Sequence, residues 1–195
     1  MKEGWQSLFP YVVDESLTLT LLQLEDAEPI FALIDESREE LREWLPWVDA
    51  SREPTHTLAF LEIVQQQHAE GRGFQVALRE HGQIVGIAGL HGVNTMHRST
   101  SIGYWLASSA VGRGLMTRAV RGMLALLFDE LGLHRVEIRA ATGNARSRAI
   151  PERLGFTREG VARESEWVND QYLDLVMYGI LEHEWRQQHH DSAQT

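Results

Sequence analysis

Short stretches of the chain alternate hydrophobic and polar residues, and this pattern predicts β-strands. β-Branched and aromatic residues are frequent in them, as in TSIGYWL at residues 100–106. His81-Gly82 and Asn169-Asp170 each separate two such stretches and predict tight turns. The expected strands cover residues 16–24, 74–79, 84–91, 100–106, 135–141, 163–168 and 172–180.

Elsewhere, apolar residues recur three and four positions apart, which predicts amphipathic helices. The clearest case follows residue 115, with apolar residues at Met116, Ala119, Val120, Met123, Leu124 and Leu127. The expected helices cover residues 27–37, 38–45, 51 or 55 to 71, 116–132 and 145–155. Their expected caps and end signals are Asp26, Pro46, Ser51 or Thr55, Gly71, Gly132, Asn144 and Gly155.

The order of these elements, β-α-α-(α)-β-β-β-α-β-α-β-β, predicts an α/β (α+β) fold. No internal repeat, low-complexity tract or linker divides the sequence. We therefore expect one domain over residues 1–186, followed by a polar, frayed tail over residues 187–195.

The composition is that of a soluble globular protein, with 195 residues of which 43% are hydrophobic. No apolar run approaches the roughly 20 residues of a membrane span, and residues 1–10 do not resemble a signal peptide. The sequence has no cysteine, which excludes disulfides, thiolate metal sites and a cysteinyl acyl-enzyme. We expect a cytoplasmic protein without a membrane partner.

The formal net charge of −10 argues against a nucleic-acid-binding protein. Basic residues are nevertheless concentrated between Arg113 and Arg158, where nine arginines occur. Such a local positive field suits a polyphosphate ligand. The alternative is a general preference for arginine, because Lys2 is the only lysine in the chain.

Two glycines stand between the strand at residues 100–106 and the helix that follows, in the segment Val111-Gly112-Arg113-Gly114-Leu115-Met116-Thr117. Glycine lets the backbone approach a ligand closely, and the amides before a helix are unpaired and carry partial positive charge. The segment therefore predicts a pyrophosphate site, and Arg113, Arg118 and Arg121 are candidates to reach further phosphates. The alternative is an ordinary turn without a ligand.

Other phosphate-binding motifs fit this segment poorly. It has no Gly-Lys-Ser/Thr, and Thr117 replaces the third glycine of a dinucleotide fingerprint. The segment resembles motif A of the GCN5-related N-acetyltransferases (GNAT), Gln/Arg-x-x-Gly-x-Gly/Ala. Val111 and Met116 depart from that pattern and Gly114 keeps it. Met116-Thr117 is similar to the RimJ/RimL-type branch, which acetylates ribosomal-protein N-termini.

A second segment strengthens the resemblance. Asn144, Ser147 and Leu154-Gly155-Phe156 resemble motif B, and Glu166-Trp167 resembles the same branch. The element order matches along nearly the whole chain. The resemblance implies a mixed, mostly antiparallel sheet of about seven strands, with helices on both faces. It also implies a splay between the family's fourth and fifth strands, here residues 102–106 and 135–141, where the pantetheine arm of acetyl-CoA enters.

The resemblance further implies that acetyl-CoA is the co-substrate. Its expected contacts are Trp105, Leu106, Val111, Gly112, Arg113, Gly114, Leu115, Met116, Thr117 and Asn144. A backbone amide near Leu106 is the implied donor to the oxyanion. The alternative role for Asn144 is helix capping alone.

Catalytic roles are also implied by the resemblance. Many family members protonate the thiolate with a motif B tyrosine, but Pro151 stands there in this chain. The RimL-type branch implies that Ser147 is the acid and Glu166 the base. The alternative for Ser147 is a hydrogen bond to free amides at the helix start, and the alternative for Glu166 is an ordinary solvated carboxylate. Trp44, Trp47 and Tyr104 are expected to line the acceptor site, with the core as an alternative for the two tryptophans. No histidine has a convincing metal-ligand spacing, so no metal is expected.

Three functions remain open at this stage. The first is direct acetyl transfer to a protein N-terminal amine, because a neutral amine must attack and an α-amine has a pKa of about 8 against about 10.4 for lysine. The second is acetylation of a small amine such as a polyamine, amino acid or antibiotic. The third is a non-catalytic acetyl-CoA sensor. A homodimer is common in this branch.

Overall fold

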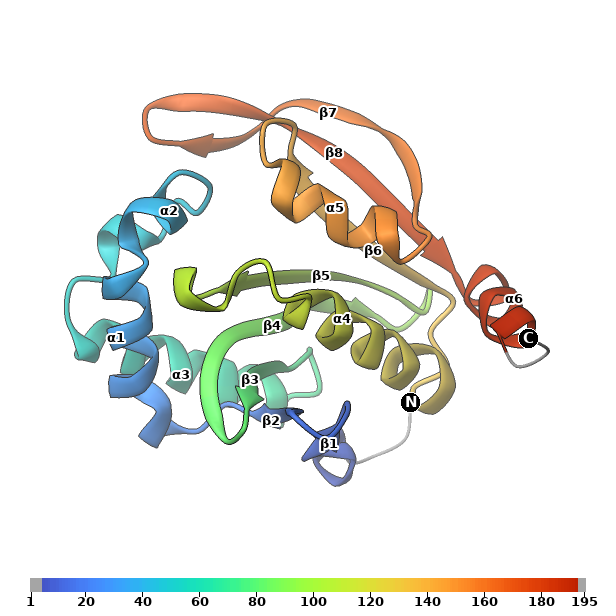
Figure 1. Ribbon diagram of the computed structural model, residues 1–195, viewed down its shortest axis with the longest axis horizontal. Coiled ribbons are helices and arrows are strands. Elements are labelled where there is room, and N and C mark those ends of the chain that lie inside the picture. Colours follow the sequence, from blue (N-terminus) through green and yellow to red (C-terminus); the bar gives the residue numbers. More distant parts are fainter. Residues whose placement is uncertain (1–4, 193–195) are drawn as a thin grey trace.

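The computed structural model describes residues 5–192 and contains one eight-stranded sheet in the order β1-β2-β3-β4-β5-β6-β8-β7 (Figure 1). All neighbouring strands are antiparallel except the parallel pair β5–β6. The predicted mixed, mostly antiparallel sheet is confirmed, and a short edge strand, β1, adds an eighth strand. The bounds are β1 Tyr11–Val12, β2 Leu17–Leu21, β3 Gln75–Glu80, β4 Gln83–Asn94, β5 Ser99–Leu106, β6 Arg135–Ala141, β7 Thr157–Val168 and β8 Gln171–Leu181.

The helices lie close to their predicted positions. The α-helices are α1 Ala27–Glu36, α2 Arg38–Arg42, α3 Pro54–Ala69, α4 Leu115–Ala125, α5 Ala145–Arg153 and α6 Glu182–Ser192. Single 3₁₀ turns are η1 Trp5–Leu8, η2 Leu24–Asp26, η3 Val48–Ala50 and η4 Ser108–Ala110, and a π-helical turn, η5 Leu126–Glu130, extends α4. None of the helices in residues 5–192 is both long and apolar enough to cross a membrane.

Two predicted helix starts were wrong. Helix α3 begins at Pro54, because the fixed φ of proline suits the first helical position and its missing N–H costs nothing there. Asp26 precedes α1 but does not cap it. Its buried carboxylate instead accepts the amide of Gln23 (3.1 Å) and pairs with Arg79 (2.6 Å), which ties the start of α1 to β3.

The C-terminal segment also differs from the prediction. Residues 187–192 belong to helix α6, and residues 193–195 of the predicted tail lie outside the described residues. Trp185 anchors this helix, since its side chain is 3% exposed and its ring lies 6.0 Å from that of Phe128. Burial of this apolar surface explains why a polar segment forms a helix here.

The sheet separates two hydrophobic clusters. Alternate residues of a strand point to opposite faces, so Val76 and Ala88 pack against α4 and α5, whereas Ala77 and Ile87 pack against α1 and α3. Helices therefore cover both faces, as predicted, and in Figure 1 helices α1–α3 gather at one end of the sheet and α5 lies over β6. We call the first side the α4/α5 face and the second the α1/α3 face.

The parallel strands β5 and β6 pair only at their beginning. Their register runs from Ser99 opposite Arg135 to Ile102 opposite Ile138 and then stops. Beyond this point strand β6 pairs only with β8 on its other side, as far as Ala141 opposite Leu175. The predicted splay is therefore confirmed, and it begins directly after Ile102 and Ile138.

Candidate active site

A cleft of about 1850 Å³ opens where β5 and β6 separate. Its walls come from α1–α3, from β4–β6, from the turn before α4, from α5 and from β7. The two predicted motifs, which are about 30 residues apart in the sequence, meet at this cleft. All of the predicted site residues line it except Arg113 and Arg121.

The glycine turn has the shape of an anion site. Gly112 (φ +83°) and Gly114 (φ +73°) both have left-handed backbone conformations, and a Cβ at either position would have no atom within 4 Å. The first amide bonded inside α4 is that of Arg118, which donates to the carbonyl of Gly114 (3.1 Å). The amides of residues 115–117 precede it and lack helical acceptors. This open turn with free donors fits a pyrophosphate.

The arginines near the turn have acidic partners. Arg113 pairs with Glu80, and Arg118 pairs with Asp14 (2.5 Å) and also donates to Ser16 (3.1 Å). The predicted contacts of Arg113, Arg118 and Arg121 with further phosphates remain a prediction. These ion pairs partly neutralise the local positive field, which leaves the backbone of the turn as the main candidate for binding an anion.

Asn144 caps the N-terminus of helix α5, which was the alternative to a role in coenzyme binding. Its Oδ1 accepts the amide of Ser147 at 3.0 Å, which fixes the start of α5. Asn144 also lines the cleft, so capping and coenzyme contact are compatible. Its predicted role in binding the coenzyme remains a prediction.

Ser147 and Tyr104 are hydrogen-bonded across the splay. The Tyr104 hydroxyl on β5 donates to the carbonyl of Ser147 on α5 (3.0 Å), and the Ser147 hydroxyl donates to that of Tyr104 (3.4 Å). Burial raises the pKa of Tyr104, so its hydroxyl stays protonated. Tyr104 lies on the α4/α5 face, opposite Ala88.

A bulge in β7 positions Glu166. Ala162 is opposite Leu175 and Glu166 is opposite Leu173, so four steps on β7 match two on β8. Within the bulge Glu164 has a φ of +47°, and its amide donates to Asp174 (2.8 Å). Glu166 lines the cleft half-buried, and this burial raises its pKa.

The strand register gives the face on which Glu166 lies. Directly opposed residues of an antiparallel pair share a face, so Glu166 lies on the same face as Leu173. Leu173 is three residues before Val176 and so points to the other face, and Val176 packs on the α4/α5 face. Glu166 therefore projects on the α1/α3 face. Ser147, which bonds Tyr104, lies on the opposite face.

Three tryptophans form the wall on the α1/α3 face. The rings of Trp47 and Trp105 lie 6.2 Å apart, and Trp47 is 39% exposed. Trp44 packs over Gly143, where a Cβ would lie 3.3 Å from its ring. Trp44 and Trp47 thus border the cleft without being fully buried, which leaves their predicted role as an acceptor wall open.

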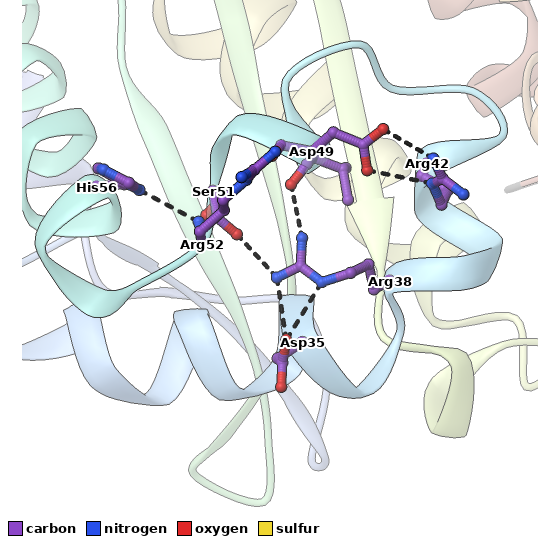
Figure 2. A network of polar contacts seen from close by, with 8 residues as sticks. Asp35, Arg38, Arg42, Asp49, Ser51, Arg52 and His56 are labelled. Carbon is purple, nitrogen blue, oxygen red and sulfur yellow. Dashed lines mark hydrogen bonds and ion pairs between the residues drawn. The ribbon is translucent and has the colours of Figure 1, made fainter. Parts of the chain in front are cut away.

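A polar network, which the sequence did not predict, fixes the segment that carries two of these tryptophans (Figure 2). The guanidinium of Arg38 donates to the carbonyls of Val48 (2.7 Å) and Ser51 (2.8 Å) and pairs with Asp35 (3.0 Å). Arg42 and Asp49 form a second pair at 2.9 Å. These contacts fix the chain that directly follows Trp44 and Trp47, because Val48, Asp49 and Ser51 all come after the two tryptophans.

Comparison with known proteins decides the family. The Acetyltransferase (GNAT) domain matches residues 16–157. The chain belongs to the GNAT family of acetyltransferases. This GNAT chain is 37% identical over 179 residues to a protein of Bacillus subtilis (strain 168) named "Putative ribosomal N-acetyltransferase YdaF", a match that covers 91% of the chain and 98% of the relative.

Two further relatives agree with this assignment. The ribosomal-protein-serine acetyltransferase of Escherichia coli (strain K12) is 24% identical over 87% of this chain and 94% of its own length. A solved structure of RimL, a ribosomal L7/L12 alpha-N-protein acetyltransferase in complex with coenzyme A, shares the fold at a TM-score of 0.84 and 21% identity. That match covers 87% of this chain and 96% of the other. The predicted resemblance to the RimJ/RimL-type branch is confirmed.

Proposed function

We propose that this acetyltransferase moves the acetyl group of acetyl-CoA directly to the α-amine of a protein N-terminus, with a ribosomal protein as the acceptor class. One observation carries the proposal. The splay after Ile102 and Ile138 joins two half-sites, with the Ser147 hydroxyl on one face and the Glu166 carboxylate on the other. A thioester between them has a candidate proton donor on its sulfur side and a candidate proton acceptor on its amine side.

Direct transfer follows from the residues available. The chain has no cysteine that could carry an acetyl group, so donor and acceptor must be bound together. Bringing two reactants into one geometry contributes about 7–11 kcal/mol. A cleft of about 1850 Å³ that opens toward both faces has room for both reactants.

The peptide backbone supplies a candidate oxyanion donor. The amide of Ala107 donates to Val85 on β4 (2.9 Å). Successive amides of a strand point to opposite sides, so the amide of Leu106 points away from β4, toward the gap left by β6. In our proposal this amide stabilises the oxyanion, Glu166 accepts a proton from the amine and Ser147 delivers one to the thiolate.

The preference for an α-amine rests on proton affinity. At pH 7 roughly a tenth of an α-amine with a pKa of about 8 is neutral, against under a thousandth of a lysine side chain. A half-buried carboxylate such as Glu166 is a sufficient base for the first and a weak one for the second. The names of the relatives support a ribosomal acceptor. A cytoplasmic location and a homodimer are part of the proposal and remain predictions.

A product screen tests the proposal. The purified chain is incubated with acetyl-CoA and either N-terminal peptides of ribosomal proteins or small amines, and the products are measured by mass spectrometry. The proposal predicts a mass gain of one acetyl group at the peptide α-amine. Blocking the α-amine by formylation is the matched control and is expected to abolish the gain. Acetylation of polyamines or amino acids but not of peptides would support the small-amine alternative.

A further inference from the structure

A histidine that the two motifs do not include lies where β5 and β6 separate. His91 is on β4, at a bulge between Leu90 and Val93, and it lines the cleft. Its ring covers the backbone of Gly103, because a Cβ at Gly103 would lie 2.1 Å from the His91 Nε2. Gly103 directly follows Ile102, the last residue of β5 that pairs with β6. The imidazole therefore lies at the narrow end of the splay.

The strand register also gives the face of this imidazole. Gly103 alternates with Tyr104 and so points to the same face as Trp105, which packs against the α1/α3 cluster. His91 therefore shares a face with Trp105 and Glu166. Strand order puts it across the gap from Glu166, since β4 and β5 border one side and β6, β8 and β7 the other.

His91 has an open hydrogen-bonding capacity. Within residues 5–192 neither of its ring nitrogens has a hydrogen-bond or ion-pair partner. Arg139, which follows Ile138 on β6 and lines the same cleft, is the charged group that acts on it. His91 is still exposed to solvent, but the surrounding cleft partly desolvates its ring. This desolvation, and then the charge of Arg139, lower the pKa of His91, so the neutral imidazole with a free lone pair predominates near pH 7.

We propose that His91 is a second proton acceptor for the attacking amine, which rests on the acetyl transfer proposed above. An ammonium group must lose two protons to become an amide. Glu166 takes the first and frees the lone pair. As that lone pair forms the C–N bond, the nitrogen gives its second proton to a ring nitrogen of His91. The C–S bond then breaks, the thiolate takes one proton through Ser147, and the other proton passes to solvent.

The test uses two variants that reach the imidazole by different routes. His91→Asn removes it, and Gly103→Ala leaves it in the chain but displaces its ring. His97→Asn, on the exposed β4–β5 turn, is the matched control. The readouts are the kcat for acetylation of a peptide with a free N-terminal amine, measured against pH, and the Kd of acetyl-CoA. Both cleft variants are expected to lose about 10²-fold in kcat with a Kd within threefold of the wild type.

The pH profile separates catalysis from support of the fold. With two acceptors that must both be unprotonated, the low-pH limb of log kcat approaches a slope of 2 in the wild type. The slope is expected to fall to 1 in His91→Asn, and added imidazole is expected to restore part of the rate. A wild-type slope of 1, or a kcat within twofold in both variants, would overturn the inference. If His91→Asn no longer binds acetyl-CoA, Gly103→Ala decides.

The failure of this inference differs from the failure of the proposed function. A wild type that acetylates peptides, with a full rate in both variants, removes only the role of His91. A wild type that binds acetyl-CoA and acetylates no amine removes both.

Discussion

The hydroxyl of Tyr104 donates a hydrogen bond to the carbonyl oxygen of Ser147, at 3.0 Å, and so joins β5 to α5 across the splay. This carbonyl is free because its helical partner would be the amide of residue 151, and Pro151 has no N–H. The proline that departs from the family's motif B tyrosine thus creates an acceptor, and a tyrosine from another strand satisfies it. The same hydroxyl accepts from the Ser147 side chain at 3.4 Å, which orients the proposed acid.

Tyr104→Phe is expected to destabilise the fold by about 1–3 kcal/mol, because it leaves a partly buried carbonyl without a donor. Pro151→Ala returns a helical donor to the same carbonyl. The cost of Tyr104→Phe should therefore be smaller in the Pro151→Ala background. Urea unfolding of the four proteins in this double-mutant cycle measures the difference. An equal cost in both backgrounds would show that the proline does not create the need for the tyrosine.

Ser147→Ala and Glu166→Gln are each expected to lower kcat by about 10²–10⁴-fold and to leave the Kd of acetyl-CoA nearly unchanged. Burial raises the pKa of Glu166, and the base must be ionised, so wild-type kcat falls as the pH drops through this raised value. Glu166→Gln removes that contribution to the low-pH limb. Steady-state kinetics across the pH range, with coenzyme titration, measures both effects. Unchanged turnover in both variants would end their catalytic assignment.

The stability of the fold gives an independent check on Glu166. A carboxyl with a folded-state pKa above its unfolded value binds more protons in the folded state, so stability falls as the pH rises through that window. Glu166→Gln is therefore expected to unfold at a higher temperature than the wild type at pH 7. The difference should shrink at a pH below the unfolded pKa. Thermal unfolding at the two pH values measures it.

Gly114→Val is expected to weaken acetyl-CoA binding strongly, because the turn combines a φ of +73° with an open space that the coenzyme would fill. Gly132→Val is the matched control. It imposes the same kind of strain (φ +64°, no atom within 4 Å) after the other end of the helix, away from the cleft. Calorimetric titration should show a loss of affinity only in Gly114→Val. Similar affinities in the two variants would discredit the pyrophosphate site.

Arg38→Met is expected to raise the KM of the acceptor severalfold with little change in the Kd of acetyl-CoA. The substitution removes the hydrogen bonds to Val48 and Ser51 that hold the segment carrying Trp44 and Trp47 (Figure 2). Arg186→Met breaks an ion pair with Glu182 on α6 and serves as the control. Initial-rate kinetics with each substrate varied in turn separates the two constants. An unchanged acceptor KM would mean that this segment does not contact the acceptor.

The spacing of hydrophobic residues along the chain was sufficient to predict most of the strands and helices. It failed where buried and exposed residues do not follow the pattern of a strand or a helix. Strand β7 begins at Thr157 rather than at residue 163. Its first residues are exposed on both faces, and backbone pairing with β8 and the ion pair of Glu159 with Arg135 hold them without an alternating pattern. Helix α6 likewise forms in a polar segment because Trp185 packs into the core, where its ring meets that of the distant Phe128, and local sequence does not encode this contact.

The site was predictable only in part for the same reason. Motif spacing and the family resemblance indicated the glycine turn, Ser147 and Glu166 as candidates, and the structure places all of them at the cleft. The partners of these residues come from far along the chain. Arg118 meets Asp14, and the ring of His91 lies over Gly103 only because β4 and β5 pair with a bulge. The missing N–H of Pro151 was visible in the sequence, but its donor, Tyr104, was not.

A structure of the chain with bound acetyl-CoA tests the central claim most directly. The account predicts pyrophosphate oxygens within hydrogen-bond distance of the amides of residues 112–117, and the thioester carbonyl between β5 and β6, near the amide of Leu106 and between Ser147 and Glu166. Coenzyme bound elsewhere, or a thioester that lies outside the gap between these two strands, would contradict it.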